Sequence, residues 1–150
     1  MIRNLGKLFL ALCLLTVGGG IVANAQINSG VTIEANVPFT FVVGDTTLPA
    51  GKYDIKVLDG DSANVLELRS VHGHTSVVFD TENAETRGDQ IVSKGELAFD
   101  KIGDTYFLSQ IWMAGSASGS QLVKSRMEKR LEGKGMKSER HSIVAILRKL

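Results

Sequence analysis

The sequence predicts an all-β protein, an antiparallel sandwich or barrel of about seven or eight strands with one C-terminal α-helix. Along residues 31–43, every second residue is apolar and the residues between them are mostly polar. Shorter runs with the same alternation follow, separated by turn signals. Such alternation turns one face of a strand to the core and the other to water. The short turns predict antiparallel neighbours, because a parallel crossover needs a dozen residues or more.

The first two strands are predicted from residues 31–43. The odd positions of this run are all apolar: Val31, Ile33, Ala35, Val37, Phe39, Phe41 and Val43. One straight strand of this length would span ~43 Å, whereas strands usually span ~17–20 Å. Pro38 has no backbone N–H and is tolerated at strand starts, edges and bulges. We therefore expect two strands joined by a bend near Asn36–Pro38, with Phe41 in the core.

Three further strands are predicted in the middle of the chain, between turns at residues 44–47, 48–51, 59–61 and 72–73. Their inward side chains are expected to be Tyr53, Ile55 and Val57, then Leu66 and Leu68, then Val77 and Phe79. Residues 80–93 are polar, acidic and without a period, which predicts the longest loop.

A hairpin is predicted from residues 96–100 and 105–112, around a turn at Ile102–Asp104. Strict alternation along its second strand gives two apolar faces: Tyr106, Leu108 and Trp112 on one, Phe107 and Ile111 on the other. Apolar residues on both faces indicate that another element covers the outer face.

The covering element is predicted to be the helix, Ser120–Leu131, or about residues 120–132. Its apolar stripe has the spacing i, i+4, i+8: Val123, Met127 and Leu131. We expect this stripe to pack against the outer face of the hairpin.

The flanks of this helix are less distinct in the sequence. Ser125 and Glu128 have capping-box spacing, but the apolar period favours Ser120 as the N-cap. Residues 115–119 predict a flexible linker before the helix. The segment at residues 142–148 is short and rich in β-branched residues, which predicts a last strand. A helix is nearly as compatible with this segment.

The start of the chain has the three parts of a secretory signal, predicted to cover residues 1–25. Arg3 and Lys7 give a positive start, residues 8–17 form an uncharged apolar run, and Ala23-Asn24-Ala25 is an A-x-A cleavage site. The apolar run is short for a membrane span, which needs ~20 residues. The signal therefore predicts an exported protein, periplasmic or extracellular, without a membrane span after cleavage.

The exported chain is expected to begin at Gln26 and to form a single domain over residues 26–150. Cys13, the one cysteine of the sequence, lies within the predicted signal. Cleavage would remove it, so we expect no disulfide and no thiol chemistry in the exported chain.

Three phrases resemble a family of small secreted proteins from soil bacteria. They are V-P-F-T-F-V-V-G-D-T-T-L-P-A-G-K-Y at Val37–Tyr53, G-D-T-Y-F-L-S-Q-I-W at Gly103–Trp112 and K-S-R-M-E-K-R-L at Lys124–Leu131. The resemblance covers most of the predicted exported chain. The shared phrases are turns and strands, so it implies a secreted protein and no particular activity.

Charge is distributed unevenly along the predicted exported chain. Residues 26–112 carry 6 Lys/Arg and 13 Asp/Glu, and residues 113–150 carry 9 and 3. The basic end predicts a surface for an anionic envelope component or an acidic protein, formed by Lys124, Arg126, Lys129, Arg130, Lys134, Lys137 and Arg140. The alternative is a basic helix that lies on the protein's own acidic sheet. Nucleic acid is not expected as a partner, because the segment lacks interleaved aromatic residues.

Motifs of metal or catalytic sites are sparse. His72-Gly73-His74 has the H-x-H spacing of a metal pair, but a zinc site takes three or four protein ligands and no neighbouring His or Cys supplies them. We therefore expect a polar hairpin tip there, and no cofactor. Nucleophile motifs of hydrolases are missing from the sequence.

These observations predict an exported, non-enzymatic binding or structural module of the cell envelope or extracellular space. Two alternatives stay open. One is a carrier barrel with a small apolar ligand in its interior, and the other is a hydrolase with an unrecognised site.

Overall fold

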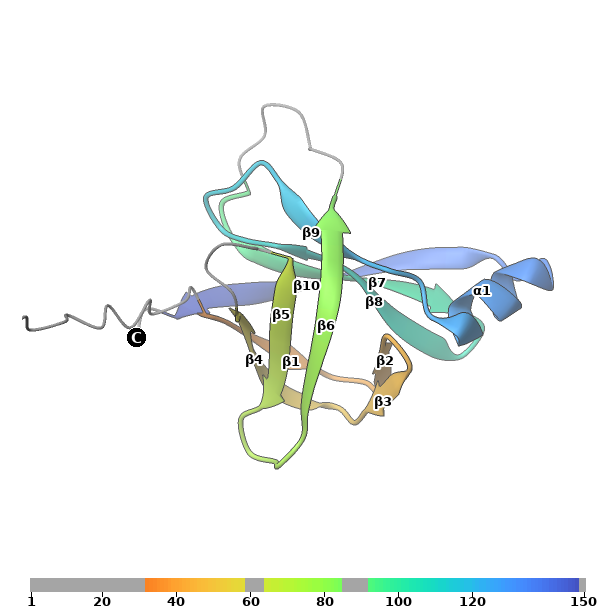
Figure 1. The fold of residues 1–150 in the computed structure, drawn as a ribbon, viewed down its shortest axis with the longest axis horizontal. Coiled ribbons are helices and arrows are strands. Elements are labelled where there is room, and N and C mark those ends of the chain that lie inside the picture. The colour runs from red at the N-terminus through yellow and green to blue at the C-terminus, as the bar shows by residue number, and fades with distance from the viewer. Residues whose placement is uncertain (1–31, 59–63, 85–91, 149–150) are drawn as a thin grey trace, which may run out of the picture.

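A computed structural model describes residues 32–58, 64–84 and 92–148, which form a closed β-barrel of eight antiparallel strands with one helix at its end (Figure 1). The elements are β1 Thr32–Val37, β2 Phe41–Val43, β3 Thr46–Leu48, β4 Gly51–Val57, β5 Val65–Ser70, β6 Ser76–Asn83, β7 Gly95–Ile102, β8 Thr105–Trp112, β9 Gly119–Leu122, α1 Arg126–Gly133 and β10 Ser138–Arg148. The barrel order is β8-β7-β10-β1-β4-β5-β6-β9, and β9 pairs again with β8. The predicted all-β class and the C-terminal helix are confirmed.

The bend predicted in the opening run lies at residues 38–40, between β1 and β2. β1 stays in the barrel, whereas β2 leaves it and pairs with β3 on one side and with β8 on the other. The β2–β8 pairing is parallel and short, with Phe41 opposite Tyr106 and Val42 opposite Phe107. Gly44 has a φ of 56° in the turn between β2 and β3, a conformation that favours glycine.

The barrel encloses one large cluster of buried apolar side chains. The inward residues predicted for β4, β5 and β6 lie in or against the core, except Val57, which is half-buried and outside this cluster. Phe41, Tyr53 and Phe99 are each at most 1% exposed. The Phe41 ring packs edge-on against both others, with centroids 5.3 Å from Tyr53 and 5.5 Å from Phe99. The Tyr53 hydroxyl donates a hydrogen bond to the Pro49 carbonyl at 2.7 Å, which satisfies its polar end.

The two faces predicted for β8 are wrong beyond its midpoint, because the strand contains a β-bulge. Ala98 of β7 lies opposite Gln110, and the next residue, Phe99, lies opposite Leu108. Ser109 is the extra residue, and its hydroxyl donates to the Ala98 carbonyl at 3.0 Å. One inserted residue exchanges the faces that follow it. Ile111 therefore points into the barrel core, and Trp112 lies on the outer side.

Two loops predicted from the sequence are shorter than expected. Residues 80–83 belong to β6, and residues 85–91 lie outside the described part of the chain. Residues 115–119 are not a linker, because they lie in the turn of the β8–β9 hairpin and at the start of β9. This turn is held by hydrogen bonds in which Gly115 N–H donates to Val92 O and Ala84 N–H to Gly119 O.

The helix is shorter than predicted and begins later. Residues 120–122 form strand β9, paired with both β6 and β8, and Leu122 lies in the barrel core. The N-cap is Ser125, whose hydroxyl accepts a hydrogen bond from the Glu128 N–H at 3.0 Å, so the choice of Ser120 as the cap was wrong. Closing the barrel requires β9, and that pairing outweighs the helical period of the preceding residues.

The apolar stripe predicted for the helix is only partly used. Leu131 packs against an outer cluster of Val42, Ile102 and Phe107, so the helix does cover the outer face of β7 and β8. Val123 and Met127, by contrast, are 53% and 38% exposed. The last segment, left open between strand and helix, is strand β10, which pairs with β7 along its first part and with β1 along its last. The predicted signal and the turn at 59–61 lie outside the described residues.

Candidate functional site

The seven predicted basic residues lie on and around α1, at one end of the barrel (Figure 1). Three of them are paired with carboxylates of this chain. Lys124 binds Glu132, Arg126 binds Asp45 at 3.2 Å, and Arg140 binds Asp100 at 2.9 Å. The hydrogen bond that Lys124 donates to Glu132 raises the pKa of Lys124. These pairs fit the intramolecular alternative.

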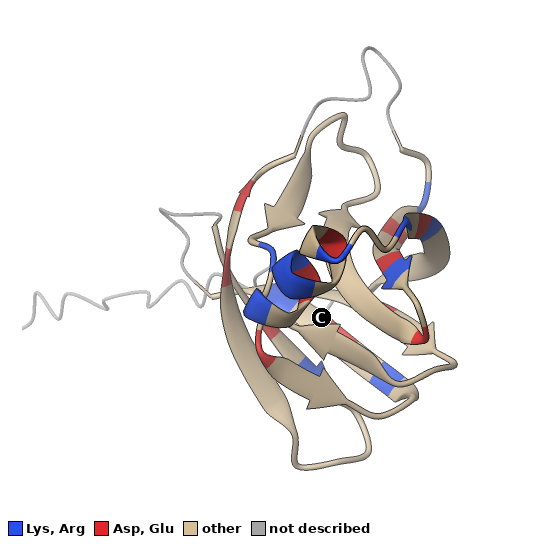
Figure 2. Ribbon diagram, turned by 90° about the vertical axis from the view of Figure 1, so that its right-hand side faces the viewer, with Lys and Arg blue, Asp and Glu red and all other residues tan. Residues whose placement is uncertain are grey.

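The other four cations of the set have no carboxylate partner among the described residues: Lys129, Arg130, Lys134 and Lys137. All four are exposed. At 100° per residue, Lys129 and Arg130 flank Arg126 on one side of the helix. Figure 2, in which α1 lies toward the viewer, shows bands of blue along the helix. We call Arg126, Lys129, Arg130, Lys134 and Lys137 the cationic face.

The opposite side of α1 is fixed against the barrel. Leu131 rests on the outer apolar cluster, and Glu128 is 4% exposed. One Glu128 carboxylate oxygen is buried without a hydrogen-bond partner among the described residues. Burial raises the pKa of Glu128, and the nearby Lys124 ammonium opposes this shift. The docked side sets the rotation of the helix and thereby turns the cationic face outward.

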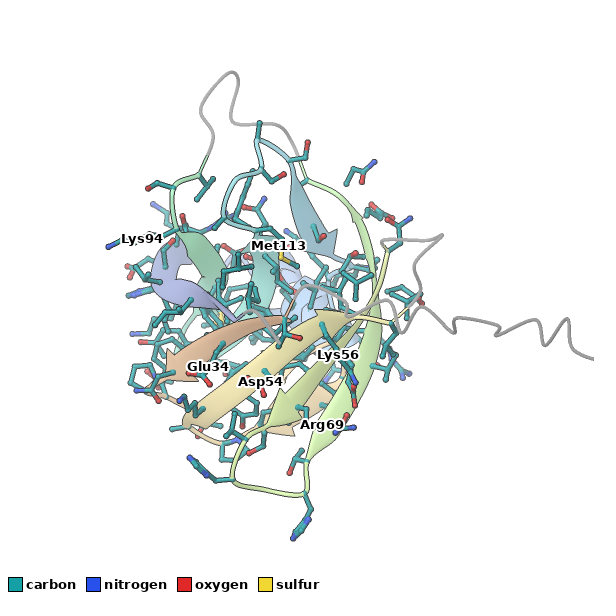
Figure 3. The ribbon with its side chains drawn as sticks, turned by 90° about the vertical axis from the view of Figure 1, so that its left-hand side faces the viewer. Glu34, Asp54, Lys56, Arg69, Lys94 and Met113 are labelled. Carbon is teal, nitrogen blue, oxygen red and sulfur yellow. The ribbon has the colours of Figure 1, made fainter. Side chains whose placement is uncertain are left out.

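A second charged surface, on β1, β4, β5 and β6, was not singled out from the sequence (Figure 3). Lys52 binds Glu34 at 2.6 Å, across neighbouring strands β4 and β1. Glu67 accepts hydrogen bonds from Ser76 at 2.6 Å and from Lys56 at 2.9 Å, and Arg69 lies 3.1 Å from it. Lys52, Lys56 and Arg69 on this second surface therefore have anionic partners within the molecule, unlike most cations of the cationic face. The sequence could not reveal these ion pairs, because they join residues on adjacent strands and depend on the strand register.

His72 and His74 lie in the turn between β5 and β6, and both are exposed. A small surface cavity of about 280 Å³ there is lined in part by His74, Arg69 and Ser76. In the described part of the chain, no three His, Cys, Asp or Glu side chains come together as a metal site would require.

A shallow groove of about 490 Å³ lies over the last part of β10 and the start of β7. Val144 and Ile146 border it and are 60% and 68% exposed, and Lys94 and Ser93 lie at its other wall. The sequence does contain a signal for this surface, because apolar residues occupy consecutive positions from 143 to 147 and cannot all face the core.

Comparisons with protein-family models, with curated proteins and with solved structures find no match to this chain. Within residues 32–58, 64–84 and 92–148, no helix has the length and apolar character of a membrane span.

Proposed function

We propose that this protein is an exported, non-enzymatic binding module whose cationic face recognises an anionic partner. The observation that carries the proposal is the contrast between two surfaces of one barrel. Lys129, Arg130, Lys134 and Lys137 gather without carboxylate partners among the described residues, while the charges on β4 and β5 are paired. Unpaired like charges at one place repel one another, and an anionic partner relieves this repulsion.

The docked side of α1 supports the same proposal. The helix packs Leu131 and buries Glu128 against the barrel, and this fixed seat presents Lys129 and Arg130 in one orientation. A rigid element holds a binding surface more accurately than a loop does. In the core, the Phe41 ring packs edge-on against the rings of Tyr53 and Phe99, so we do not put forward a carrier with an interior ligand.

The test is binding to anionic probes by the protein purified after export, with poly-glutamate and phosphatidylglycerol-containing vesicles as probes. We expect binding at 50 mM salt that weakens strongly at 300 mM, because salt screens exposed charges. The variant Lys129→Gln/Arg130→Gln/Lys134→Gln should lose most of this binding.

The matched control is Lys52→Gln/Arg69→Gln/Lys94→Gln, which removes the same charge, two lysines and one arginine, from other parts of the barrel. Its binding should stay close to that of the unchanged protein. Equal losses in the two triple variants would mean that only net charge matters, and no binding to either probe would reject an anionic partner.

A further inference from the structure

Apolar side chains lie beside the cationic face. Met127, Met136 and Val123 are 38%, 39% and 53% exposed, and all three belong to the segment that carries the cations. An exposed methionine or valine by itself needs no explanation. Three within fifteen residues, together with four cations unpaired in the described structure, form a combination that the rest of the described surface does not repeat.

The two methionines border the cationic face, Met127 in the first turn of α1 and Met136 shortly after its last residue. Met127 lies on the helix surface between Arg130 and the docked Leu131, three and four residues further on. The Met136 N–H donates to the Leu131 carbonyl at 3.3 Å, which holds Met136 against the last turn. Its methyl group reaches Gly103 in the turn between β7 and β8. Met127 therefore lies on α1 and Met136 just after it, and α1 projects from one end of the barrel (Figure 1).

This arrangement suits a bilayer surface better than a soluble polyanion. Anionic headgroups would meet the ammonium and guanidinium groups, and the acyl layer just beneath would accept the methionine side chains. Lysine and arginine have long apolar stems, which let their charges stay at the headgroups while apolar neighbours go deeper. A soluble polyanion offers nothing to the methionines.

We infer that the anionic partner is the surface of a phospholipid bilayer, which α1 meets with its cationic face while Met127 and Met136 enter the headgroup–acyl boundary. This inference rests on the proposed function and names its partner. The contact is reversible, because a few cations and two partly exposed apolar side chains provide far less affinity than a spanning helix.

The experiment compares vesicles of phosphatidylcholine with 30% phosphatidylglycerol, vesicles of phosphatidylcholine alone, and poly-glutamate. The protein is purified after export and its N-terminus is checked by mass spectrometry, so that every variant has the same start. Lys129→Gln/Arg130→Gln should lower the affinity for anionic vesicles about thirtyfold, since each cation near an anionic surface changes affinity about fivefold. Vesicles of phosphatidylcholine alone should bind weakly.

The methionines provide the distinguishing variant. Met127→Ser/Met136→Ser should lower affinity for anionic vesicles about tenfold and leave poly-glutamate binding unchanged. The matched control, Val78→Ser/Val144→Ser, removes exposed apolar groups from β6 and β10 and should not change vesicle binding. Thermal melting of each variant checks its fold. The unchanged protein gives a second measurement, because part of its vesicle binding should persist at 0.5 M salt.

The outcomes separate the two proposals. The bilayer is supported as the partner if the methionine variant binds anionic vesicles more weakly but binds poly-glutamate as before, while the valine control binds vesicles like the unchanged protein. If poly-glutamate binds as well as anionic vesicles, and the methionine variant binds both like the unchanged protein, the bilayer inference is wrong and the anion-binding function stands. Failure to bind any anionic probe overturns both.

Discussion

Glu67 and Glu128 are two buried carboxylates with opposite surroundings. Glu67 is 7% exposed and accepts hydrogen bonds from Ser76 and Lys56, with Arg69 close by. These contacts, the Ser76 hydrogen bond first, lower its pKa to about 2. Glu128 is as deeply buried but has one oxygen without a partner among the described residues, and burial raises its pKa. Hydrogen bonds to the charged form outweigh burial at Glu67, whereas burial outweighs the opposing contacts at Glu128.

Replacement of Glu67 by Gln should make stability depend less on pH. The folded pKa of about 2 lies below the ordinary value of 4.5, so the folded state holds fewer protons at Glu67 than the unfolded chain between those values. Its stabilisation is complete above pH 4.5 and is lost as the pH falls toward 2. Glu67→Gln should cost about 1–2 kcal/mol at pH 7 and progressively less below pH 4.5.

Urea unfolding at pH 7, 4 and 2.5 measures this difference. Glu82→Gln, an exposed carboxylate near the end of β6, is the control and should change stability little at any of these pH values. A constant difference between Glu67→Gln and the unchanged protein from pH 7 to 2.5 would contradict the assignment.

Gly119 has no room for a side chain. A Cβ atom there would lie 2.8 Å from Cδ2 of Trp112, whose indole is buried at 2% exposure and cannot easily move. Gly119→Ala should therefore destabilise the protein by about 1–3 kcal/mol through overpacking. Gly133→Ala, at the end of α1 with nothing within 4 Å of the new Cβ, should be neutral or stabilising. Thermal melting distinguishes the two, and equal melting temperatures would show that the indole has space to shift.

At the scale of elements, α1 is held on the barrel mainly by Leu131, rather than by the whole apolar stripe predicted from the sequence. Leu131 packs on Val42, Ile102 and Phe107, whereas Met127 is largely outside this contact. Leu131→Ala should cost about 1–2 kcal/mol, because only part of the leucine is buried. Met127→Ala should cost under about 0.5 kcal/mol.

Amide hydrogen exchange along residues 126–132 is the readout for this pair. The amides should lose protection in Leu131→Ala before the strand amides do, because the helix can open locally while the barrel stays closed. Full protection of these amides in Leu131→Ala would mean that the Ser125 cap and the ion pairs hold the helix without the leucine.

Strand positions were predictable where alternation is unbroken, as at Leu66 and Leu68 of β5. The sequence could not show the bulge at Ser109, because one extra residue changes no composition and is visible only through the partner strand. It also could not show that residues 120–122 complete the barrel, since their partners on β6 and β8 are chosen by closure rather than by local propensity.

The sequence shows which basic residues make up the candidate site, but not which of them are paired with carboxylates. All seven cations were identified from the charge pattern. Which of them are neutralised depends on partners distant along the chain: Asp45 lies 81 residues from Arg126, and Asp100 lies 40 residues from Arg140. The unpaired cations, and the methionines beside them, could be recognised only after these pairs were known.

At the scale of the whole molecule, export has a direct test. The A-x-A site at residues 23–25 predicts that the exported protein begins at Gln26. Mass spectrometry of protein recovered outside the cytoplasm should find this N-terminus. An Ala25→Leu change should block cleavage and leave a larger product, since the site requires a small residue. Exported protein that retains Met1 would contradict the predicted signal.

The pairing of β1 with β10 joins the first and last strands of the barrel, from Thr32 opposite Arg148 to Ala35 opposite Ala145. Neither strand can complete the cylinder without the other, although more than a hundred residues separate them along the chain. During synthesis, the nascent chain can therefore form hairpins such as β5–β6 and β7–β8 early, but this seam stays open until β10 has left the ribosome. Completion of the barrel is a late, non-local step, and it should be slow compared with hairpin formation.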